Sequence, residues 1–241
     1  MQASNIFAFA LYPATAVLVG GTIALWRPMK PGLISAVQHF AAGVLFCALA
    51  TELLPDLMHR KLPWVTLIGF TLGVMVMLIV KHFAEKTEQE TQDKDSTKVP
   101  TSLITILGID IALDGLLIGL GFAAGQKQGI LLTIALTLEV LFLGLSGAAA
   151  MRQGGASKNR ILFITLGFAI TLLIGAWAGF SFLSVASDIV LDAVLAFGLA
   201  ALLYLVTEEL LVEAHEVPET TLQTAMFFIG FILLLTIEMF I

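Results

Sequence analysis

Long apolar runs, separated by short polar segments, make up most of this chain of 241 residues. Eight of them reach the length of about 20 mostly apolar residues that a transmembrane helix needs. They cover residues 6–26, 33–54, 63–83, 102–125, 129–151, 161–184, 189–212 and 220–241. The runs are continuous and show little alternation at a period of two, which favours helices over the strands of a membrane barrel. The pattern predicts an all-α membrane protein with a single transmembrane domain over residues 1–241.

The polar segments between these runs predict turns and one longer loop. Residues 27–32 contain two prolines and a glycine, which are typical of helix ends. Residues 84–100 are highly charged and nearly free of apolar side chains, so we expect a flexible cytoplasmic loop there. Residues 6–26 are predicted to be a span rather than a signal peptide, because no positive charge precedes them and the run is too long.

Lysine and arginine are divided unevenly between the two sets of loops. One set holds Arg27, Lys30, Lys81, Lys86, Lys94, Lys98, Arg152, Lys158 and Arg160, and the other holds Arg60, Lys61 and Lys127. Positive residues accumulate in cytoplasmic loops, so nine against three predicts that both termini lie outside the cytoplasm. The short loops favour a bacterial inner membrane.

Composition supports the membrane prediction and excludes several functions. Hydrophobic residues make up 59% of the chain and charged residues 12%, about half the usual ~25%. A net charge of −6 without a basic stretch argues against nucleic acid as a partner. Cys47 is the only cysteine, so no intramolecular disulfide can form. No Ser/His/Asp or Cys/His constellation, HExxH motif or phosphate loop indicates an enzyme.

Three carboxylic acids lie deep within the predicted spans: Asp110, Asp114 and Glu139. An ionised side chain at the centre of a bilayer costs roughly 2.5–3.5 kcal/mol on insertion scales. No lysine or arginine lies near mid-depth in the spans to pair with them. We therefore expect these acids to face a cavity, to hold a cation or to carry protons.

Their spacing and depth favour a cation site. Asp110 and Asp114 are four residues apart and share one face of a helix, and neighbouring carboxylates repel unless a cation or a proton separates them. Asp114 and Glu139 both lie roughly 15 Å from the outer ends of adjacent antiparallel spans, near the midplane. Ligands that are all oxygen suit hard ions such as Mn²⁺, Mg²⁺ or Ca²⁺ better than they select zinc.

Other acids lie nearer the ends of spans and are expected to reach the membrane interface. They are Glu52, Asp192, Glu208, Glu209 and Glu238. Residues 50–54 (ATELL) also resemble residues 206–211 (VTEELL), in spans that run in opposite directions. Such an echo is what inverted-topology repeats in transporters predict.

With these motifs, the chain resembles the ZIP (Zrt-/Irt-like protein) family of divalent metal transporters over nearly its whole length. Eight spans, outside termini and a polar cytoplasmic loop after the third span all agree. The second span, from His39 to Asp56, is similar to the family's small-residue run ending in His-Leu-Leu-Pro-acid. The seventh, from Ala196, is similar to its counterpart, and the fourth and fifth spans take the places of the family's two metal-binding motifs.

The sequence departs from those two motifs at the metal ligands. In the fourth span Asp110 stands where the family has histidine and Ile111 replaces asparagine, while Asp114 and Gly115 are kept. In the fifth span Glu139 replaces histidine, and Val140, Phe142 and Leu143 replace a polar ligand, a proline and a glutamate. Glu52 likewise replaces the histidine of the second span. The family's binuclear centre cannot form with these residues, and at most one cation site remains.

The resemblance implies a 3+2+3 inverted-repeat bundle that works by an elevator or rocking motion. A path would run along spans two, four, five and seven, with Glu52, Glu208 and Glu209 beside it. The first hypothesis is transport of a divalent cation such as zinc, manganese or iron, with no tightly bound cofactor. The alternatives are a proton-coupled or organic-cation transporter, and a non-transporting sensor or scaffold. A homodimer is left open as its assembly.

Overall fold

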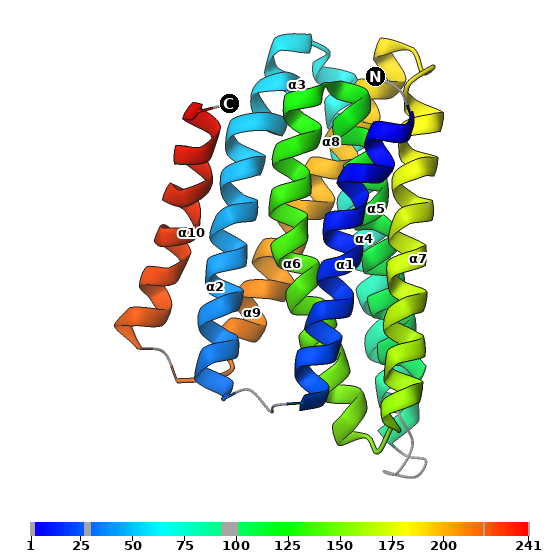
Figure 1. Cartoon of the computed structure of the whole chain (residues 1–241). Coiled ribbons are helices and arrows are strands. Elements are labelled where there is room, and N and C mark those ends of the chain that lie inside the picture. The colour runs from blue at the N-terminus through cyan, green and yellow to red at the C-terminus, as the bar shows by residue number, and fades with distance from the viewer. Residues whose placement is uncertain (1–2, 27–29, 93–100, 219, 241) are drawn as a thin grey trace.

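The structure is a computed structural model that describes the backbone of residues 3–26, 30–92, 101–218 and 220–240. Side chains are described for residues 6–26, 30–83, 104–218 and 220–240. Within these ranges every regular element is a helix, and eight continuous helical stretches are long and apolar enough to cross a membrane (Figure 1). The prediction of an all-α membrane protein with eight spans is confirmed.

Six of the spans are single helices. They are α1 (Ala3–Trp26), α4 (Pro63–Gln92), α5 (Thr101–Ala124), α6 (Gln126–Gln153), α7 (Lys158–Leu183) and α10 (Thr221–Phe240). The other two each contain a π-helical turn. The second span comprises α2 (Pro31–Ala48), η1 (Leu49–Leu53) and α3 (Leu54–Arg60), and the seventh comprises α8 (Asp188–Tyr204), η2 (Leu205–Leu210) and α9 (Leu211–Ala214).

The two π-helical turns fall on the two copies of the sequence echo. Glu52 lies in η1, and Glu208 and Glu209 lie in η2. Such turns insert one extra residue into a helix and are frequent at functional sites. In the second span Pro55 comes two residues after the end of η1, and because it has no N–H to donate, one backbone hydrogen bond of a regular α-helix is missing at this point. The echo therefore has a structural counterpart in spans that run in opposite directions.

The expectation of a flexible loop over 84–100 is wrong for its first half. Helix α4 continues without a break through this stretch to Gln92. Seven of residues 84–92 are Ala, Glu, Lys or Gln, which are good helix formers. Residues 93–100 lie outside the described residues.

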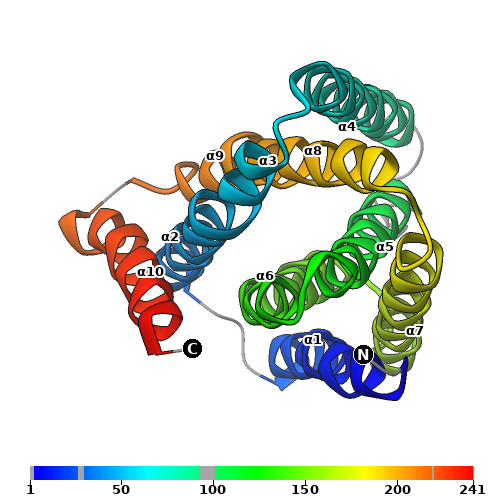
Figure 2. The ribbon, with the colours of Figure 1, turned by 90° about the horizontal axis from the view of Figure 1, so that it is seen from above.

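The spans gather into two bundles rather than into three sequential blocks (Figure 2). The first bundle consists of α1, α5, α6 and α7. The second consists of α2, α4, α8 and α10, together with the short elements that continue α2 and α8. Contacts are densest in the pairs α1 with α6, α5 with α7, α2 with α10 and α4 with α8, and they are fewer where the two bundles meet, chiefly between α2 and α6. The 3+2+3 order along the chain thus becomes a four-plus-four arrangement in space.

Glycines permit the closest helix contacts within each bundle. A Cβ atom at Gly144 would collide with the backbone of Val17, and one at Gly115 would collide with that of Leu172. These contacts join α6 to α1 and α5 to α7. In the second bundle Gly43 meets Phe227, which joins α2 to α10. Small residues let helix backbones approach in this way where no hydrophobic effect drives association.

The helix pairs repeat with inverted direction. The first span packs on the fifth as the sixth packs on the fourth, and the second packs on the eighth as the third packs on the seventh. The chain starts and finishes on the same side of the molecule, which we call the upper face (Figure 1). The side on which α1 ends and α7 begins is the lower face.

Candidate cation site

The three deep acids predicted from the sequence lie together in the first bundle. Asp110 and Asp114 are one turn apart on α5, and Glu139 lies on the neighbouring helix α6. One oxygen from each carboxylate lies within 4.8 Å of the others. Their exposed fractions are 8%, 1% and 0%. The structure therefore places three carboxylates around one small volume inside the protein.

Close packing on both sides fixes the two helices that carry these acids. Helix α5 is held against α7 at Gly115, directly after Asp114, and α6 is held against α1 at Gly144, five residues after Glu139. The two helices approach each other at Gly121, whose Cβ position lies 3.1 Å from the Cα of Gly129. All ligand atoms of the cluster thus belong to one tightly packed unit.

The buried carboxylates lack the partners that such groups normally have. Both carboxylate oxygens of Asp114 and both of Glu139 are buried without a hydrogen-bond partner. None of the ion pairs formed by described residues involves the three acids. Since buried like charges repel and desolvation is costly, the cluster is suited to a cation or to protons that compensate it.

The two adjacent glutamates of η2 have different surroundings. Glu209 is partly buried and lies close enough to the cluster for its charge to act on Asp110, Asp114 and Glu139. Glu208 is exposed and forms an ion pair with Lys81 of α4, with Oε2 and Nζ 3.5 Å apart. The sequence grouped these two glutamates together, and the helical turn directs them to different surroundings.

Polar side chains continue from Glu209 towards the lower face, and one of them, Gln38, gave no signal in the sequence. Glu213 lies one turn beyond Glu209 and accepts a hydrogen bond of 2.7 Å from Nε2 of Gln38 on α2. The ring of His39 meets that of His215 edge-on at 5.1 Å between centroids. The spacing of Glu209 and Glu213 by four residues was the available signal for this row.

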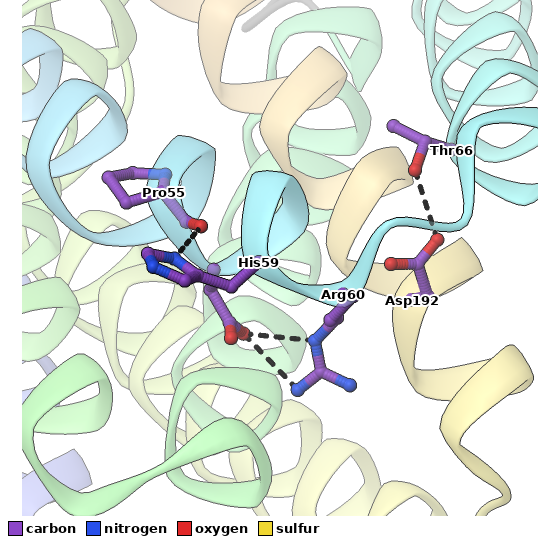
Figure 3. Close-up of polar contacts among 6 residues, drawn as sticks. Pro55, His59, Arg60, Thr66 and Asp192 are labelled. Atoms are coloured by element: carbon purple, nitrogen blue, oxygen red, sulfur yellow. Dashed lines mark hydrogen bonds and ion pairs between the residues drawn. The ribbon is translucent and has the colours of Figure 1, made fainter.

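Two acids expected at the membrane interface are instead buried between helices. Glu52 is 5% exposed and pairs with Lys127 of α6, with Oε1 and Nζ 3.5 Å apart. Asp192 is fully buried near the start of α8 and accepts a hydrogen bond of 3.1 Å from Thr66 of α4 (Figure 3). Neighbouring helices cover these span ends, so the acids face protein rather than headgroups.

Figure 3 also shows the polar contacts in the last turns of the second span, near the upper face. His59 bonds the carbonyl of Pro55 through Nδ1 at 2.7 Å, and Arg60 pairs with Asp56 at 3.2 Å. Lys61 then adopts a left-handed backbone conformation with φ of 55°, which ends the helix before Pro63 starts α4. These polar groups bond to one another within α3 and are not part of the deep cluster.

Comparison with known proteins identifies the family. A sequence profile described as "ZIP Zinc transporter" matches residues 80–238, which include the whole of the acidic cluster. The chain belongs to the ZIP family. A curated relative, the zinc transporter GufA of Myxococcus xanthus, is 31% identical over 146 residues. That match covers 59% of this chain and 57% of the relative, so the chain spans less than two thirds of the relative's length.

Membership of the ZIP family confirms the resemblance noted in the sequence. The differences from the family's metal-binding motifs can therefore be compared position by position. Ile111 and Val140, which replace polar ligands of the family pattern, are both fully buried apolar side chains. Among the described residues, the three acids form the one group of His, Cys, Asp and Glu side chains close enough to share an ion. This ZIP protein thus has an arrangement that suits a single, carboxylate-only site.

Proposed function

We propose that this ZIP protein transports a divalent metal cation across the membrane, with Asp110, Asp114 and Glu139 as its ligands at mid-depth. The observation that carries the proposal is the convergence of three buried carboxylates whose oxygens lie within 4.8 Å of one another. Two of them have no hydrogen-bond partner. A divalent cation compensates this charge, and each of the three acids offers it an oxygen.

The position of the cluster supports transport rather than static binding. Its ligands all belong to the first bundle, while the polar row of Glu209, Glu213 and Gln38 belongs to the second. Because contacts between the bundles are fewer than those within them, the site can shift relative to that row without breaking its own geometry. The name of the Myxococcus xanthus relative, a zinc transporter, agrees with a metal as cargo.

The chemistry of the ligands favours a hard ion over zinc. Zinc sites in proteins usually include histidine or cysteine, whereas oxygen-only sites suit Mn²⁺, Mg²⁺ and Ca²⁺. No histidine or cysteine takes part in the cluster. Within the family's range of divalent metals, we therefore propose Mn²⁺ as a better substrate than Zn²⁺.

Uptake into proteoliposomes tests the proposal directly. Wild-type protein should accumulate Mn²⁺, Asp114→Ala should abolish uptake, and Asp188→Asn should leave it unchanged. Asp188 is a matched control because it is an exposed acid in the first turn of α8, far from the cluster in sequence and at the upper face. Unchanged uptake in Asp114→Ala would refute these ligands, and metal-induced thermal stabilisation without any uptake would indicate a sensor or scaffold.

We also propose that the upper face lies outside the cytoplasm. The support is the uneven division of lysine and arginine between the two sets of loops in the sequence, nine against three. A reporter enzyme that is active only outside the cytoplasm, fused after Ile241, should be active in intact cells. The same reporter active only when inserted in the segment 93–100 would reverse the orientation.

A further inference from the structure

One lysine connects the two bundles at the upper face. Lys127 lies in the first turn of α6, in the first bundle. Its Nζ is 3.5 Å from Oε1 of Glu52 in η1 and 3.5 Å from Oε1 of Glu238 in α10. Both glutamates belong to the second bundle, so a single ammonium group spans the boundary between the bundles.

This connection differs from the other polar contacts between helices described above. Thr66 with Asp192, Gln38 with Glu213 and Lys81 with Glu208 all join members of the second bundle. Arg152 of α6 bonds the last carbonyls of α1, Ala24 at 3.2 Å and Leu25 at 3.1 Å, within the first bundle. Lys127 alone in this set reaches across.

The two glutamates need a cation at this place. The side chain of Glu52 is 4% exposed and that of Glu238 is 15% exposed, and the charge of Glu238 acts on Glu52. One oxygen of Glu238 is buried with no hydrogen-bond partner. Because Lys127 is 45% exposed, its ammonium can withdraw to water, whereas the glutamates cannot. The contact is therefore modest in strength and can be released from the lysine side.

We propose that Lys127 is an ionic latch that holds the upper ends of the two bundles together, and that it must release before the cation site opens to the upper face. This inference rests on the proposed transport function. Above Asp114, towards the upper face, Leu117 and Leu120 of α5 pack against α8 at Gly198, where a Cβ atom would lie 2.6 Å and 3.1 Å from their Cδ2 atoms. The latch lies on that same upper side, so its release permits these helices to separate.

A cysteine placed in this contact between α5 and α8 reports its opening. Leu120 is 1% exposed and can be replaced by cysteine in a Cys47→Ser background. A membrane-impermeant thiol reagent is applied to intact cells and to inverted vesicles, so that it reaches each side in turn. Removing the latch with Lys127→Gln should raise the labelling rate from the upper side about fivefold, as expected for an ion pair of this exposure.

Matched variants make the result specific. Lys127→Arg keeps the charge and should label like the parent. Glu238→Gln should reproduce the effect of Lys127→Gln, and the double variant should add little to either. An unchanged labelling rate in both Lys127→Gln and Glu238→Gln would overturn the latch.

The same reporter separates the latch from the proposed transport site. Asp114→Ala removes a metal ligand but leaves Lys127 and its partners in place. If Asp114→Ala transports normally while Lys127→Gln speeds labelling, the ligand assignment fails and the latch stands. If Asp114→Ala abolishes uptake while Lys127→Gln changes neither labelling nor uptake, the latch fails and the site stands.

Discussion

Asp114 on α5 and Glu139 on α6 lie at the same buried level with all four carboxylate oxygens lacking a hydrogen-bond partner. Asp110 adds a third carboxylate within reach of both. Acids placed in this way weaken the fold of the metal-free protein, because burial and mutual repulsion both oppose the charged forms. Three carboxylates that lower the stability of the metal-free protein and attract a cation to the same volume indicate a binding site.

Removing one of these charges should stabilise the metal-free protein. We expect Asp114→Asn to raise the melting temperature by a few degrees in chelator, because it relieves repulsion within the cluster. Wild-type protein should gain about 2.7 kcal/mol at a metal concentration one hundred times Kd, and the variant should lose most of this gain. Differential scanning fluorimetry with and without Mn²⁺ checks both effects. A variant that is less stable without metal yet retains the full gain would contradict the interpretation.

Restoring an imidazole should change the preferred ion. Glu139→His puts nitrogen among the ligands, at the position where the family pattern has histidine. We expect the ratio of Zn²⁺ to Mn²⁺ uptake to rise by about tenfold, because imidazole suits zinc better than manganese. Glu139→Gln is the matched control, since it removes the charge without supplying nitrogen as a metal ligand. Equal ratios in the two variants would show that ligand type does not set selectivity here.

The adjacent glutamates of η2 should differ in their contribution to transport. Glu209 acts on all three acids of the cluster, whereas Glu208 pairs with Lys81 at the protein surface. We expect Glu209→Gln to slow uptake about tenfold, equivalent to ~1.4 kcal/mol of barrier. Glu208→Gln should change it by less than about twofold. Initial rates at saturating Mn²⁺ measure the comparison, and a larger effect in Glu208→Gln would reverse the assignment.

Glycine positions within the second bundle should be sensitive where backbones touch. Gly43→Ala drives a methyl group into the backbone at Phe227 and should cost about 1–3 kcal/mol of stability. Gly167→Ala on α7 is the control, because apart from the nearby backbone of its own helix no atom lies within 4 Å of the position a Cβ would take. Alanine there should be neutral or stabilising by up to about 1 kcal/mol, through its better helix propensity. Thermal melting in detergent distinguishes the two, and similar losses would contradict the packing argument.

The arrangement along the chain could be predicted from the sequence, and the arrangement in space could not. Hydropathy alone defines eight spans, because a bilayer requires continuous apolar runs. Depth counting placed Asp114 and Glu139 at one level, and the structure brings their carboxylates together. Which helices pair depends on glycines such as Gly43 and Gly144, whose contacts lie far away in sequence. Hydropathy therefore does not predict which spans group into each bundle.

The surroundings of individual charged side chains could not be predicted from the sequence either. Glu208 and Glu209 are neighbours in one acidic pair, and their difference depends on the helices around them, since Glu208 is exposed and pairs with Lys81 of α4 while Glu209 is partly buried. Asp192 lies near the start of its span, and only the neighbouring helix α4 makes it a buried group. Lys127 counted as an ordinary loop charge, although it contacts acids from two other spans. Each of these outcomes depends on tertiary neighbours, to which local patterns do not respond.

The separation of the molecule into two bundles has a consequence for how such a protein can diversify. The deep acids are supplied by α5 and α6 alone, while the helices α2, α4, α8 and α10 contribute none of them. Exchange of histidine for carboxylate at the deep positions therefore alters only the first bundle and leaves the helix contacts of the second bundle as they are. The residues of the deep site and the packing of the second bundle can therefore change independently of each other during evolution.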